Sequence, residues 1–96
     1  MKVQQVVREL EQAVRELGIP VRRERGSFRG GLCVRHDETL LMLNKNHPPE
    51  AHLAVLARSL RTLPVDTIYL RPVVRRALED AWSAAVEVEL TEDADG

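Results

Sequence analysis

The chain has 96 residues, the length of one small domain, and its 44% hydrophobic and 30% charged residues exclude a disordered protein. The formal net charge of −1 gives no argument for nucleic acid or a membrane surface as the partner of the whole domain. A single cysteine, no signal-peptide pattern and no apolar run near the ~20 residues of a membrane span predict a cytoplasmic protein without an intramolecular disulfide or a membrane segment.

Residues 3–17 form the first predicted element, an amphipathic helix. Apolar residues recur there at spacings of three and four, at Val3, Val6, Val7, Leu10, Val14 and Leu17. Gly18 follows where a helix end favours a left-handed residue, and Pro20 prevents continuation. We therefore expect the helix to pack its apolar face on the domain.

Residues 19–44 predict three strands of an antiparallel sheet, at 19–25, 32–36 and 39–44. The turn-rich sequence from Gly26 to Gly31 connects the first two strands, and Asp37-Glu38 is the predicted turn between the second and the third. In the second strand, alternation predicts Leu32 and Val34 on one face and Cys33 and Arg35 on the other.

The third predicted strand contains four consecutive apolar residues, from Leu40 to Leu43. Since strand side chains alternate, two of them lie on each face, and both faces of this strand require burial. One layer of helices covers only one face, so the other needs either the third helix or a second protomer. This pattern is the basis for predicting a homodimer.

Two further helices follow the sheet. One starts near Pro49 and ends before Pro64, and the other starts at Pro72 and continues through Ala85. Residues 86–90 fit either the end of this helix or a short added strand. The expected fold is α+β, with a helix, a three-stranded antiparallel sheet and two further helices in one domain of residues 1–90, followed by an acidic disordered tail at 91–96.

The glycine-rich connection is a candidate anion-binding site. Backbone N–H groups and two guanidinium groups there can face an anion, and the proposed residues are Arg25, Ser27, Arg29, Gly30 and Gly31. The connection lacks the lysine and the spacing of a P-loop, and its glycines also suit a plain turn with positive φ. Five arginines around Phe28 extend the hypothesis to nucleic acid, although a single aromatic residue is no stacking platform.

Cys33 and His36 support a third hypothesis, a small enzyme with a cysteine nucleophile and a histidine base. Together with His47 and His52 they are also potential zinc ligands, but their spacing matches none of the common zinc patterns. A cysteine in a strand is more commonly a small buried apolar residue. The sequence therefore assigns no catalytic residue, no metal site and no cofactor.

Residues 6–62 carry a helix, Gly18-Ile19-Pro20-Val21, a glycine-containing hairpin, Leu43-Asn44 and a helix with Leu56-Ala57. This order resembles the scaffold of the ImmA/IrrE-type metallopeptidases. The family's H-E-x-x-H zinc motif aligns with residues 58–62, which here read RSLRT, so the resemblance implies the scaffold without its catalysis. The whole chain, with GG-x-C at 30–33 and Asn44-Lys45 before the proline turn, also resembles short uncharacterised bacterial proteins, which implies no activity.

These patterns favour a non-catalytic interaction module that acts as a homodimer and that can bind a further protein partner. An anion- or nucleic-acid-binding domain that uses the Arg25–Gly31 loop is the first alternative. A small enzyme centred on Cys33 and His36 is the second.

Overall fold

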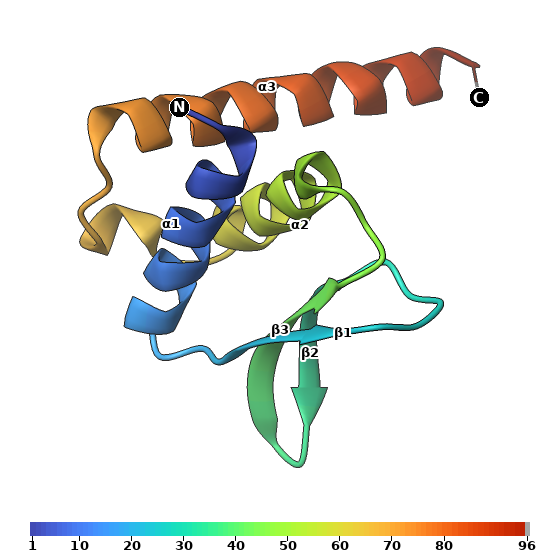
Figure 1. Cartoon of the computed structure of the whole chain (residues 1–96). Coiled ribbons are helices and arrows are strands. Elements are labelled where there is room, and N and C mark those ends of the chain that lie inside the picture. Colours follow the sequence, from blue (N-terminus) through green and yellow to red (C-terminus); the bar gives the residue numbers. More distant parts are fainter. Residues whose placement is uncertain (96) are drawn as a thin grey trace.

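The computed structural model describes the backbone of residues 1–95 and the side chains of residues 1–85. Within that range, helices lie on one side of a small sheet (Figure 1). The helices are α1 (Val3–Glu16), α2 (Pro49–Arg61) and α3 (Pro72–Asp95), with a short 3-10 helix, η1 (Val65–Thr67), before α3. The strands are β1 (Val21–Glu24), β2 (Gly31–Arg35) and β3 (Glu38–Asn44). The predicted α+β class is confirmed.

The sheet is mixed, so the prediction of a purely antiparallel sheet is wrong. The strand order is β1-β3-β2, with β1 parallel to β3 and β2 antiparallel to it. The strand with the longest apolar run thereby takes the centre, where both of its edges are paired. β1 carries Arg22, Arg23 and Glu24, and charged residues of this kind suit a strand at the edge of a sheet.

The turn between β2 and β3 lies one residue earlier than predicted. Arg35 pairs with Glu38, so the two loop residues are His36 and Asp37. Both have positive φ, at 51° and 64°, as a two-residue type I′ turn requires. This turn matches the twist of the two strands and sets their register.

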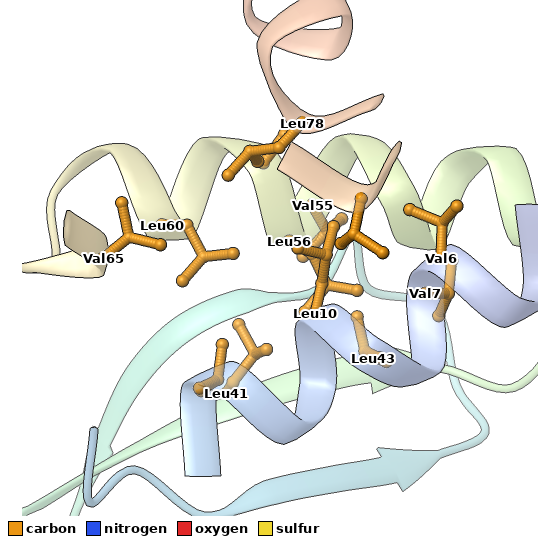
Figure 2. Close-up of a cluster of buried hydrophobic side chains, with 13 residues drawn as sticks. Val6, Val7, Leu10, Leu41, Leu43, Val55, Leu56, Leu60, Val65 and Leu78 are labelled. Atoms are coloured by element: carbon orange, nitrogen blue, oxygen red, sulfur yellow. The ribbon is translucent and has the colours of Figure 1, made fainter. Parts of the chain in front are cut away.

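The helices and the inner face of the sheet share one aliphatic core (Figure 2). α1 contributes Leu10 and α2 contributes Leu56, both fully buried. Leu41 and Leu43 enter from β3, and Leu78 enters from α3. The predicted apolar stripe of the first helix therefore forms the centre of the core.

α3 lies across α1 and α2, on the far side of the helical layer from the sheet (Figure 1). The Trp82 indole N–H donates to the carbonyl of Ala57 at 2.6 Å, which fixes α3 on α2. The guanidinium groups of Arg61 and Arg75 lie 5.9 and 5.7 Å from the centre of the Trp82 ring. α3 thus stabilises the helical layer and leaves the outer face of the sheet without a helix.

The two faces of β3 are buried in different ways. Leu41 and Leu43 lie under the helices and are fully buried. Leu40 and Met42 point to the outer face, yet each is only 6% exposed. Leu40 lines a hollow together with the long side chains of Arg22 and Arg35, and the loop between β1 and β2 lies beside Met42.

None of the helices in the described residues has the length and apolar character that crossing a membrane requires. The backbone of residues 91–95 belongs to α3, and the side chains of the predicted acidic tail, 91–96, lie outside the described residues. The disorder of this tail stays a prediction.

An ion pair links the start of α3 to α1. Arg71 donates two hydrogen bonds to the Glu9 carboxylate, and these bonds lower the pKa of Glu9. A lowered folded-state pKa adds stability that is complete above the ordinary pKa range of glutamate and is lost as the pH falls through the folded-state value. We expect Glu9→Gln to lower the melting temperature at pH 7 but to match the wild type near pH 2.

Thermal unfolding followed by circular dichroism across this pH range measures the effect. Glu38→Gln is the matched control, because Glu38 is exposed and has no ion pair among the described residues. A loss in Glu9→Gln that does not change with pH would contradict the assignment.

Candidate functional site

The predicted anion-binding loop, residues 25–31, is held by one buried side chain at the end of β3. Asn44 is 2% exposed, and its amide nitrogen donates to the carbonyls of Gly26 at 2.7 Å and Phe28 at 2.8 Å. Its amide oxygen accepts from the backbone N–H of Asn46 at 2.9 Å. The loop therefore has a defined conformation even though it lies outside the regular strands.

Gly30 brings the loop close to the central strand. Its φ of 89° lies in the left-handed region, and a Cβ at this position would lie 2.7 Å from the Met42 carbonyl oxygen. Both the conformation and the close approach require glycine here. The glycines of the predicted loop thus serve the fold directly.

A groove of about 570 Å³ lies between this loop and β2. Four of the five predicted anion-binding residues line it: Arg25, Arg29, Gly30 and Gly31. Ser27 does not line the groove. Apolar side chains form much of the remaining wall, from Phe28, Leu32, Val34 and Met42.

Cations outnumber acids along this groove. Glu24 lies 3.9 Å from Arg22 and 4.0 Å from Arg35, distances at the outer limit of an ion pair. No carboxylate of the described side chains lies within 4.0 Å of Arg25 or Arg29. The two predicted arginines are therefore available for a group from outside the domain.

Cys33 and His36, the predicted nucleophile and base, are not brought together. Cys33 is half-buried on β2 and faces the loop groove, whereas His36 sits in the turn and lines a different hollow with Arg22 and Leu40. Within residues 1–85 no hydrogen bond joins the Cys33 sulfur to a histidine. The described side chains also contain no cluster of three or more His, Cys, Asp or Glu suited to a metal ion.

A hollow of about 550 Å³, separate from the loop groove and from the hollow beside His36, was not predicted from the sequence. It lies where α1, β1 and the first turn of α2 meet, and it is lined by Arg8, Glu11, Arg23, Lys45, His47 and His52. Glu11 is 5% exposed, and its Oε1 accepts from Nε of Arg23 at 2.9 Å and forms an ion pair with Nη2 of Arg23 at 2.7 Å. His52 is also 5% exposed, and its Nε2 lies 2.6 Å from the Asn44 carbonyl oxygen.

Both buried polar residues carried a signal in the sequence. Glu11 lies within the apolar stripe of α1, between Leu10 and Val14, and His52 lies beside Leu53 on the buried side of α2. A charged residue on a buried helix face needs a partner, but the partner of Glu11 is twelve residues away, on β1.

The chain matches no family model, and no curated protein or solved structure is significantly similar to it. The resemblance to the metallopeptidase scaffold therefore stays a prediction. The loop groove, the hollow beside Glu11 and the edges of the sheet are the features that bear on function.

Replacement of Asn44 tests whether it holds the loop. We expect Asn44→Ala to lower the free energy of unfolding by about 2–4 kcal/mol, because two loop carbonyls and one N–H lose their partner. Urea unfolding followed by circular dichroism measures the change. Asn46→Ala is the control, with an expected loss below about 0.5 kcal/mol, because only its backbone takes part. Equal losses in the two variants would contradict this role.

Two glycines with similar φ allow the cost of a strained backbone to be distinguished from the cost of a close contact with a neighbouring strand. Gly18 has φ 86° and no atom within 4 Å of the position that a Cβ would take, whereas Gly30 has φ 89° and the Met42 oxygen at 2.7 Å. We expect Gly18→Ala to lower the free energy of unfolding by about 1–2 kcal/mol, because alanine is strained in the left-handed backbone conformation. Gly30→Ala should cost about 1–3 kcal/mol more, because the loop must move away from β3. The same urea unfolding measures both, and equal costs would refute the close approach.

Proposed function

We propose that the chain is a non-catalytic interaction module that binds a second copy of itself through β2. The observation that carries this proposal is the position and exposure of β2. It lies at an edge of the sheet, and its side chains Leu32 and Val34 are 36% and 69% exposed. An edge strand presents backbone N–H and C=O groups that can pair with another strand. The other edge strand, β1, is instead rich in charge.

The sequence of β2 is complementary to itself in the antiparallel direction. When two copies pair around Cys33, Leu32 of each lies opposite Val34 of the other, and Arg35 lies opposite Gly31. No like charges meet along the ladder. The same register, continued past the strand ends, brings Arg29 toward Asp37 of the second copy, an attractive pair.

The groove beside β2 supports the same proposal through its composition. Phenylalanine, methionine and arginine are enriched in protein interfaces, and Phe28, Met42, Arg25 and Arg29 all line this groove. Arginines without an internal carboxylate partner can form an ion pair with a carboxylate of a second protein. Leu32 and Val34 then gain the burial that α2 does not give them.

Size-exclusion chromatography with light scattering tests the proposal. We expect twice the monomer mass at both low and high salt, since the contact is mainly apolar and backbone-mediated. Val34→Lys should shift the chain to monomer, because a lysine on the edge strand opposes pairing. Val73→Lys is the control, because Val73 is 48% exposed but lies on α3, and this variant should remain dimeric.

Cross-linking provides an independent readout. The proposed register places the two Cys33 side chains opposite each other, so mild oxidation should link the wild type into a disulfide dimer and leave Cys33→Ser unlinked. A monomer at all concentrations, or a dimer that Val73→Lys disrupts and Val34→Lys does not, would refute association through β2.

The two arginines also favour a second candidate function, the binding of an anion or of nucleic acid by the loop. Arg25 and Arg29 have no carboxylate partner among the described side chains. Salt-dependent retention on heparin that Arg25→Ala/Arg29→Ala abolishes would favour it over self-association.

A further inference from the structure

The hollow between α1, β1 and the start of α2 carries an inference that is independent of self-association. Its charged lining consists of the cations Arg8, Arg23 and Lys45 and one acid, Glu11. Its volume of about 550 Å³ lies within the range of small-molecule sites, roughly 300–1,000 Å³. The excess of positive charge indicates an anionic ligand.

Glu11 and Arg23 form the fixed part of this site. The buried Glu11 carboxylate accepts a hydrogen bond from Nε of Arg23, and Nη2 of Arg23 lies 2.7 Å from the same carboxylate oxygen. This ion pair holds the guanidinium in one orientation. The carboxylate and the guanidinium neutralise each other. Arg23 keeps N–H donors on Nη1, for which no described residue is an acceptor.

Two cations remain without an internal partner. Neither Arg8 on α1 nor Lys45 after β3 has a carboxylate of the described side chains within 4.0 Å. Both are exposed and line the same hollow. Two unpaired positive charges match the charge of a phosphate monoester near neutral pH. The N-terminus of α2, at Pro49 on the same wall, adds to the positive potential.

His52 adds an acceptor to this set of donors. A carbonyl oxygen only accepts hydrogen bonds, so the contact with the Asn44 oxygen assigns the proton to Nε2 of His52. In the neutral ring, Nδ1 then carries the lone pair, and no described residue donates to it. A ligand hydroxyl is a suitable donor for this nitrogen.

We propose that this hollow binds a small phosphate monoester that carries a hydroxyl group. Arg8, Lys45 and the Nη1 group of Arg23 contact the phosphate oxygens, and Nδ1 of His52 accepts from the hydroxyl. The hollow is local, and the domain as a whole is slightly acidic, which favours a small molecule over a nucleic acid strand.

Ribose 5-phosphate is the probe, titrated into the full chain while backbone amide resonances are followed by nuclear magnetic resonance. We expect saturable shifts at Lys45, His47 and the first turn of α2. Inorganic phosphate should bind at the same residues more weakly, because it lacks the sugar hydroxyls, and ribose alone should not bind. The comparison distinguishes a monoester site from a site for free phosphate.

Charge-removing variants test the residues. Arg8→Gln and Lys45→Gln should each weaken ribose 5-phosphate binding about tenfold, which corresponds to about 1.4 kcal/mol for a lost charge-assisted contact. Arg15→Gln is the matched control on the same helix, exposed and outside the hollow, and should change the affinity less than about twofold. Each of these side chains is exposed, so the variants should fold.

His52→Gln tests the acceptor separately, because a glutamine amide can still donate to the Asn44 carbonyl but offers no Nδ1 lone pair. We expect it to retain phosphate binding and to lose the preference for ribose 5-phosphate. No shifts at millimolar ribose 5-phosphate, an equal loss in Arg15→Gln, or tighter binding of a single-stranded oligonucleotide at these residues would overturn the proposal.

Discussion

The end of β3 at Asn44 is the junction on which both hollows depend. Its side chain fixes the loop between β1 and β2 by donating to Gly26 and Phe28. Its backbone carbonyl accepts from the backbone N–H of His47 at 3.0 Å and from the His52 ring. A single buried residue therefore connects the loop groove on one side to the charged hollow on the other. An apolar residue here would continue the pattern of the strand but would leave the carbonyls of Gly26 and Phe28 and the backbone N–H of Asn46 without this partner.

Local patterns in the sequence were enough to identify the elements but not all of their pairings. The spacing of apolar residues located α1, because a helix face repeats every three to four residues. The run from Leu40 to Leu43 indicated a strand buried on both faces, and that strand is the central one. The parallel pairing of β1 with β3 depends on contacts between Val21 and Leu41, twenty residues apart, and no local rule selects that partner over β2.

The two candidate sites differ in how many of their residues could be predicted from the sequence. Arg25, Arg29 and the glycines are neighbours in the chain, so their clustering was visible in the sequence. Whether Ser27 lines the groove depends on the exact path of the loop, which the sequence does not specify. The residues of the charged hollow come from positions between Gln4 and His52, and only the tertiary fold brings them together. The local signals were two polar residues on buried helix faces, Glu11 on α1 and His52 on α2. The meaning of Glu11 became clear only with the position of Arg23 on β1.

The sheet order also separates the two proposed activities in space. β2 and β1 form opposite edges, with β3 between them. The proposed self-association would use the backbone and apolar side chains of β2. The charged hollow takes Arg23 from β1 and the remainder of its lining from α1, from the connection between β3 and α2, and from the start of α2. A second copy on β2 therefore leaves the hollow open to solvent. The Asn44 side chain contacts the loop and its carbonyl contacts His52, so the end of β3 is in direct contact with both regions.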